Sequence, residues 1–149
     1  MKIVINENRQ IEETEIVINC QQIDDNILRI CAGLRMYDRK VMGVLEEQVF
    51  LLKPYDIFYI ETVDRKTFLY TQKQVYETPL KLYELEESLM PDDFIRASKS
   101  CILNFGRVKL ICGDFGGRLI CVMENGESIV VSRQYSPVIK LKLGFERRR

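Results

Sequence analysis

The amino-acid sequence predicts an α+β fold that is dominated by antiparallel β-structure. Short runs rich in β-branched and aromatic residues follow one another closely along most of the chain, which is typical of sheets built from hairpins. An Asn125-Gly126 pair between two of these runs is a strong signal for a two-residue hairpin loop. Helical spacing of apolar residues is confined to a few short segments. We therefore expect short β-sheets with small helices.

The first 45 residues are predicted to form a ββα extension. Two β-type runs, at 2–6 and 15–20, enclose a polar stretch and predict a hairpin. Apolar residues then recur at spacings of four, three and four, which predicts a helix beginning at Asp24 or Asp25. This stripe consists of Ile23, Ile27, Ile30 and Leu34. Because so short a unit cannot bury a core alone, we expect it to dock on the rest of the chain or on a partner.

A second domain is predicted over 46–149. Its first helix is expected to begin at Thr78-Pro79, because Thr can cap free amides and Pro at the first helical position loses no hydrogen bond, and to end at Pro91. A short last helix is predicted from Ser136-Pro137 to Gly144. The predicted strands are 49–53, 57–61, 66–71, 74–77, 94–98, 101–104, 108–112, 118–124 and 127–131.

Composition narrows the class of protein. No apolar run approaches the roughly 20 residues of a membrane-spanning helix, and the N-terminus turns polar after three apolar residues, unlike a signal peptide. These features predict a cytoplasmic protein. The five cysteines are odd in number, none form a C-x-x-C pair, and histidine is absent, so neither a zinc site nor a disulfide framework is predicted. We expect the cysteines to act as small hydrophobes, with redox sensing by an exposed thiol as the alternative.

The charges are unevenly distributed although their sum is zero. Residues 77–93 carry six acids and one base, whereas the chain from Arg96 onward carries eleven bases and four acids. A neutral total can conceal a basic face that meets phosphates, and a solvated surface is the alternative interpretation.

Nothing in the sequence indicates an enzyme. The commonest general base is missing, and neither a nucleophile elbow nor a glycine-rich phosphate loop is present. Asp92-Asp93 is interpreted as a polar turn after a helix rather than as a metal-binding pair. No cofactor and no small-molecule substrate are predicted.

Three turns carry residues suited to nucleic acid. They lie at 64–67, 98–100 and 132–135, and each combines a long cation with hydroxyl or amide groups. Such groups bind phosphate oxygens, and Arg or Lys can also reach the O6 and N7 atoms of guanine. No helix-turn-helix is evident, and Tyr59, Phe68 and Tyr70 are interpreted as packing residues rather than base-stacking platforms.

These strings together resemble a LytTR DNA-binding domain. The resemblance begins with DIFYIETVDRKT at 56–67 and continues with YE at 76–77 and LKLYELE at 80–86. It includes FIRASKSCILN at 94–104, NGE at 125–127 and VSRQY at 131–135. The match covers about two-thirds of the chain in the family's order, and the segment at 94–104 together with the Ser-Arg-x-Tyr end at 132–135 is fairly specific.

The resemblance implies a sequence-specific regulator whose loops enter successive major grooves of a repeated duplex site. The family's base-contacting positions correspond here to Lys66 or Thr67, to Lys99, and to Arg133. The family often has His or Asn at the first two, and this chain departs from that pattern, which bears on its DNA sequence preference and not on its mode of binding. Ser100 is expected to hold a phosphate, and Arg96 and Asn104 to serve either DNA or the fold.

The first 45 residues resemble the extension of stand-alone members that lack a receiver domain. This implies a homodimer, and leaves open a membrane-protein partner and a dimerising or regulatory role for the extension. The rival hypothesis is a protein–protein interaction module without DNA binding, which the zero net charge favours.

Overall fold

The computed structural model describes residues 1–144 and contains two antiparallel sheets with three α-helices. The first sheet has seven strands in the order β2-β1-β5-β4-β3-β7-β6, and the second has three in the order β10-β9-β8. The strands are β1 (Val41–Leu45), β2 (Gln48–Leu52), β3 (Tyr59–Val63), β4 (Lys66–Tyr70), β5 (Val75–Thr78), β6 (Phe94–Ser98), β7 (Cys101–Asn104), β8 (Val108–Gly113), β9 (Leu119–Met123) and β10 (Ser128–Val131). The helices are α1 (Asp25–Arg35), α2 (Leu82–Leu89) and α3 (Ser136–Lys142). The predicted fold class is confirmed.

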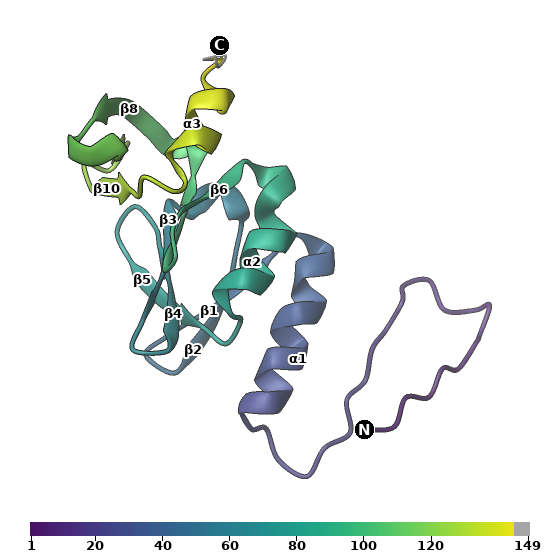
Figure 1. Ribbon diagram of the computed structural model, residues 1–149. Helices are drawn as coiled ribbons and strands as arrows, with labels where there is room; N and C mark the ends of the chain where they lie inside the picture. The colour runs from purple at the N-terminus through teal and green to yellow at the C-terminus, as the bar shows by residue number, and fades with distance from the viewer. Residues whose placement is uncertain (145–149) are drawn as a thin grey trace.

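Two apolar cores lie on opposite faces of the seven-stranded sheet. Helices α1 and α2 cover one face, while the three-stranded sheet and α3 sit at one end of the molecule (Figure 1). Leu85 and Leu89 of α2 pack with Ile60 and Ile102 on the helix side. On the other side, Leu103 belongs to a separate cluster with residues of β9, β10 and α3. Because side chains alternate between the two faces along β3 and β7, each of these strands contributes residues to both cores.

Tight turns fix the register of the hairpins. Glu46-Glu47 and Asp64-Arg65 are two-residue loops whose residues all have positive φ, the backbone that matches strand twist. The loop containing Asn125-Gly126 differs from the two-residue prediction. Only Gly126 has positive φ there, and Met123 N–H donates to the Glu127 carbonyl, so three residues form the loop.

Helix α2 begins three residues later than the capping pattern predicts, at Leu82 instead of Pro79. Thr78 remains in β5, where it is paired with Thr67 and buried, so it is not available as an N-cap. Its hydroxyl instead accepts from Leu80 N–H at 3.4 Å. Lys81 occupies the N-cap position without a side-chain hydrogen bond. Strand pairing therefore prevails over the local Thr-Pro signal, whereas α3 starts at Ser136 as predicted.

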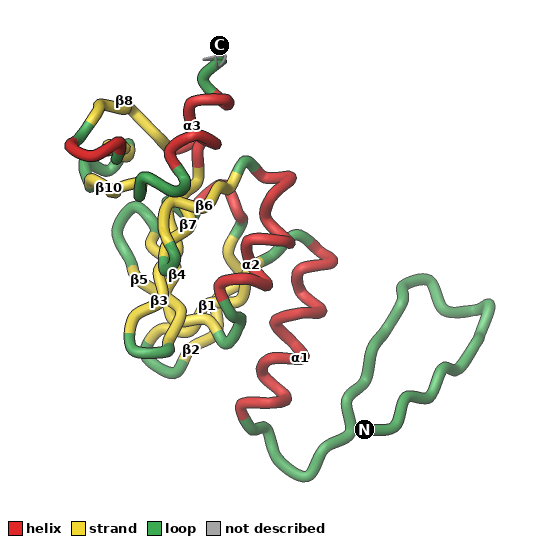
Figure 2. The backbone as a smooth tube through the Cα atoms, in the orientation of Figure 1, coloured by secondary structure: helices red, strands yellow, loops and turns green. Residues whose placement is uncertain are grey.

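The two strands predicted at 2–6 and 15–20 are not formed. Residues 1–24 contain turns but no strand, and in Figure 2 they trace an open loop that extends away from the body. Apart from the partly buried Ile18, the large apolar side chains of both runs are exposed and no strand lies alongside them, so their β-propensity has no partner strand. The helix of the extension is confirmed: Asp24 caps α1 by accepting from Ile27 N–H at 3.0 Å.

Strand β1 is an element that the periodicity did not predict. It pairs with β2 along its whole length and with β5 at Val44, so residues 41–45 lie inside the seven-stranded sheet. Ala32 of α1 is fully buried in the same core as Val41. The division of the chain at residue 45 stays a prediction.

The cysteines divide into buried and exposed groups. Cys101 and Cys121 lie in the second core, and burial raises their thiol pKa values to about 12 and about 11. Cys20 and Cys112 are exposed. Within residues 1–144, no helix has both the length and the apolar character needed to cross a bilayer.

We expect Gly43→Ala to destabilise the protein by about 1–3 kcal/mol, because a Cβ at this position would lie 2.8 Å from Cβ of Tyr76 on the adjacent strand. Gly33→Ala is the matched control. Nothing lies within 4 Å of the added methyl group in α1, so helix propensity should stabilise this variant by roughly 0.5–1 kcal/mol. Urea unfolding measures both, and equal stabilities for the two variants would contradict the close approach of β1 and β5.

Candidate nucleic-acid interface

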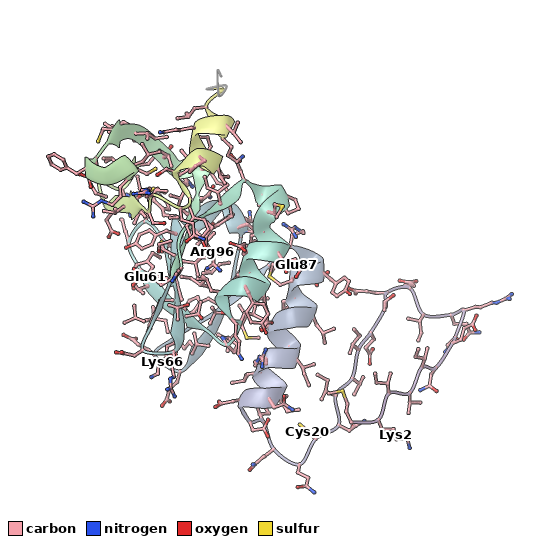
Figure 3. All side chains as sticks on the ribbon, in the orientation of Figure 1. Lys2, Cys20, Glu61, Lys66, Glu87 and Arg96 are labelled. Atoms are coloured by element: carbon pink, nitrogen blue, oxygen red, sulfur yellow. The ribbon has the colours of Figure 1, made fainter. Side chains whose placement is uncertain are left out.

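The β3–β4 hairpin presents Lys66 at its tip. Asp64 and Arg65 form the loop with φ values of 50° and 66°, and Val63 pairs with Lys66 across it. Lys66 is exposed, whereas Thr67 is only 6% exposed. Figure 3 shows Lys66 pointing outward from the end of the sheet. Of the two sequence candidates at this position, only Lys66 is accessible to a ligand.

The β6–β7 turn presents Lys99 and Ser100, both exposed. Ser98 pairs with Cys101 across the turn, and the Ser98 hydroxyl accepts from Ser100 N–H at 3.3 Å. The Arg96 guanidinium donates to the Lys99 carbonyl at 3.2 Å and lies 2.8 Å from a Glu86 carboxylate oxygen on α2. Arg96 thus braces the turn that carries Lys99 against the helix layer, which is a role in the fold.

The loop after β10 presents Arg133. Its neighbour Ser132 has a carbonyl that accepts from the backbone N–H groups of Tyr135 and Ser136, both at 3.0 Å, which makes the loop compact. Arg133 is exposed at its head. A Cβ at Gly117 would lie 3.2 Å from Cγ of Arg133, so the aliphatic stem runs directly over the Gly117 backbone. The turn at 114–117 therefore restricts where Arg133 can point.

Two backbone hydrogen bonds connect these three loops. Thr62 N–H donates to the Ser100 carbonyl at 2.8 Å, which joins the β3–β4 hairpin to the β6–β7 turn. Ser132 N–H donates to the Ala97 carbonyl at 2.8 Å, which joins the third loop to the same strand pair. We call the exposed side chains that the loops carry, Lys66, Lys99, Ser100 and Arg133, the loop surface.

The cations of the loop surface are unpaired. Among residues 1–144, Lys66, Lys99 and Arg133 form no salt bridge. By contrast, the acids of the α2 region neutralise arginines of the fold: Glu84 lies 2.5 Å from Arg29, and Asp92 pairs with Arg39. Three acids of the α2 region, Glu84, Glu86 and Asp92, are thus paired with arginines, whereas the cations of the loop surface are not.

Asn104 serves the fold. Its side chain is 2% exposed, donates to the Ile57 carbonyl at 3.0 Å and accepts from Gly106 N–H at 3.0 Å. It thereby caps the short 3-10 turn Phe105–Arg107 and holds the segment before β3 in place. The nitrogen and the oxygen of the Asn104 amide are both hydrogen-bonded within the protein. The alternative that this side chain contacts DNA directly is therefore not supported.

An open groove of about 370 Å³ adjoins Arg133 and was not found by sequence reasoning. It is lined by Gly116, Gly117, Arg133, Ser136, Pro137 and Lys140. Phe115, beside it, is 87% exposed at the tip of the β8–β9 turn. Lys140 is exposed and forms no salt bridge within the described part of the chain. The Gly116-Gly117 pair was the signal for this groove in the sequence, but only the fold shows that the pair lies next to Arg133.

The aromatic residues that might have stacked on bases are engaged within the protein. Tyr59 and Tyr70 stack on each other with ring centroids 4.2 Å apart. The Tyr59 hydroxyl donates to Glu127, and burial together with this carboxylate raises the Tyr59 pKa. The contact fixes the start of β10 on the seven-stranded sheet, and Arg133 follows two residues after that strand ends. The packing interpretation is confirmed for this pair.

Comparison with known proteins gives a consistent result. A family model described as the LytTr DNA-binding domain matches residues 47–144. A solved LytTr DNA-binding domain from Bacillus cereus superposes with a TM-score of 0.68 and 28% identity, covering 72% of this chain and 98% of that one.

Two curated relatives differ in the extent of their match. Sensory transduction protein LytT of Enterococcus faecalis is 31% identical over 100 residues, which are 67% of this chain and only 41% of that protein. An uncharacterized HTH-type transcriptional regulator of Staphylococcus aureus is 26% identical over 147 residues, covering 97% of this chain and 99% of that protein.

We expect Asn104→Ala to lower the free energy of unfolding by about 1–3 kcal/mol, because it leaves the buried Ile57 carbonyl without its donor. Lys99→Ala, at an exposed position, should change it by less than about 0.5 kcal/mol. Thermal and urea unfolding compare the two. Full stability of Asn104→Ala combined with lost ligand binding would assign this amide to the ligand instead.

Proposed function

Because this chain belongs to the LytTR family of DNA-binding domains, we propose that it is a transcription regulator that binds a specific duplex through its loop surface. The observation that carries the proposal is the row of unpaired, exposed cations on three loops that are hydrogen-bonded to one another. Phosphate contacts supply most of the affinity of such a surface, and contacts to base edges supply the specificity.

Arg133 is the residue best suited to read a base. Its guanidinium can bind the O6 and N7 atoms of guanine in a bidentate manner, and the contact of its stem with Gly117 reduces the freedom lost on binding. Lys99 lies on the adjacent turn, where Arg96 holds the backbone that presents it. We assign base contacts to Arg133 and Lys99, entering the major groove as loops.

Lys66 and Ser100 are assigned to the DNA backbone. Both residues lie close to the hydrogen bond that joins their loops. A DNA backbone that crosses this end of the sheet would therefore meet the Ser100 hydroxyl and the Lys66 ammonium group in turn. Lys140 extends the basic surface beyond Arg133, and Phe115 offers an apolar edge for a deoxyribose. Thr67, Arg96 and Asn104 support these contacts from within the fold.

A protein interaction module is the second candidate function. The exposed apolar side chains of residues 1–24 favour it. This segment lies apart from the loop surface in Figure 1, so a protein partner bound to it would leave the loop surface free. A cytoplasmic location and a homodimer belong to the proposal, and a membrane-protein partner stays a prediction. A titration against duplexes selected from a random pool separates the candidates, because a pure interaction module would enrich no sequence.

We expect Arg133→Ala to weaken binding to the selected duplex by about 1–3 kcal/mol and to relax specificity at one base pair. Arg35→Ala, on the exposed side of α1, is the control that should bind as the wild type does. Fluorescence anisotropy with selected and random duplexes measures the difference. An equal loss on both duplexes would exclude the base-reading role.

Lys140→Gln should weaken binding to all duplexes alike and make the dependence of log affinity on log salt shallower by about one unit, because one phosphate contact is lost. Lys73→Gln is the matched control, since Lys73 lies in the β4–β5 turn at the end of β4 opposite Lys66. Titrations at several salt concentrations provide the slopes. An unchanged slope for Lys140→Gln would place the groove outside the interface.

A further inference from the structure

Phe115, at the tip of the β8–β9 turn, is an exposed aromatic residue that takes no part in either apolar core. The residue is 87% exposed, whereas the other five phenylalanines among residues 1–144 are buried or partly buried. An aromatic ring of this size carries a hydration cost in water that packing within the fold does not offset here. The ring is therefore available for contact with a ligand.

The turn holds the backbone of Phe115 in place. Asp114 N–H donates to the Arg118 carbonyl at 3.0 Å, and the Arg118 guanidinium donates to the Phe115 carbonyl at 3.2 Å. The same guanidinium lies 3.0 Å from the Asp114 carboxylate. These contacts close the base of the turn, so the ring moves chiefly about its own side-chain torsions. A side chain presented on a fixed backbone loses little conformational freedom when it binds.

Two glycines bring this turn alongside Arg133. Gly116 and Gly117 have φ values of 71° and 80°, in the left-handed region that favours glycine. A Cβ at Gly117 would lie 3.2 Å from Cγ of Arg133, so the backbone approaches the arginine as closely as a glycine allows. Phe115 is two residues from this contact, which is at most about 7 Å along the chain. The ring and the guanidinium can therefore reach the same ligand.

The groove beside Phe115 suits a sugar–phosphate strand. Gly116 and Gly117 line it together with Arg133 and Lys140, and its volume is about 370 Å³. Neither cation forms a salt bridge with the residues that the structure describes. A DNA strand lying in this groove would place its phosphates between the two cations. A phosphate strand separates the major groove from the minor groove, so a strand bound here brings both grooves within reach of the protein.

We propose that Phe115 is a wedge that enters the minor groove and inserts between two base pairs next to the base that Arg133 contacts. This inference rests on the proposed function and extends it from contact with a regular duplex to deformation of that duplex. Apolar side chains inserted in this way unstack one base step and kink the DNA. Pyrimidine–purine steps unstack most readily, so the wedge adds a sequence preference at a step to which the protein donates no hydrogen bond.

The test uses the full chain with the duplex that it selects from a random pool. The fluorescence of 2-aminopurine, moved step by step through the duplex, reports unstacking, and energy transfer between labelled DNA ends reports the kink. The wild type should increase both signals, and Phe115→Ala should abolish both and weaken binding by about tenfold. Tyr37→Ala is the matched control, because Tyr37 is 88% exposed in the short turn after α1. It should behave as the wild type does.

An abasic site at the unstacked step isolates the wedge, because the cost of unstacking is then already met. The wild type should bind this duplex at least about tenfold more tightly than the intact one, and Phe115→Ala should gain nothing. Specific binding without unstacking at any step overturns the wedge alone. A loss of affinity in Phe115→Ala, when the wild type leaves the duplex stacked and straight, also overturns it and assigns the ring to a deoxyribose. If the wild type enriches no duplex, the proposed function fails and the wedge fails with it.

Discussion

The backbone hydrogen bonds that join Thr62 to Ser100 and Ser132 to Ala97 are the constraint on which the site depends. They make one row of three loops that are distant in sequence and belong to different sheets. The turn at Lys99 lies between the other two, so any movement of it displaces both neighbours. The two apolar cores and the Tyr59–Glu127 contact hold the sheets in the relative position that these bonds need.

The arginines that form salt bridges within the fold are distinct from the exposed cations of the proposed binding surface. Arg29, Arg39 and Arg96 satisfy the acids of the α2 region and support the helix layer. The cations of the loop surface face solvent without partners, so their full charge is available to a polyanion. A net charge of zero is therefore compatible with DNA binding, because acids of the α2 region are paired with arginines and not with the cations of the loop surface.

The sequence pattern predicted the bounds of an element correctly where strand pairing in the fold agreed with that pattern. Strands β6 and β7 have the predicted bounds, because alternating residues there face both cores. At Thr78 strand pairing prevailed over the pattern, because pairing with Thr67 keeps Thr78 in a strand. The runs at 2–6 and 15–20 find no partner strand among residues 1–144. For the site, sequence placed Lys99 and Arg133 on loops. It could not show that Thr67 and Asn104 are buried, since burial depends on strands that are remote along the chain.

The shortness of the loops limits how such a regulator can evolve. The β3–β4 and β6–β7 connections have two residues each, and their backbones are committed to turn conformation or to hydrogen bonds. An insertion in either would break the row, whereas a side-chain exchange at Lys66 or Lys99 leaves it intact. In the proposed interface, the spacing between the loops is therefore fixed by the fold, whereas the side chains that would contact bases can be exchanged. A preference for a new operator would then arise by substitution of these side chains, without a change in the spacing of the loops.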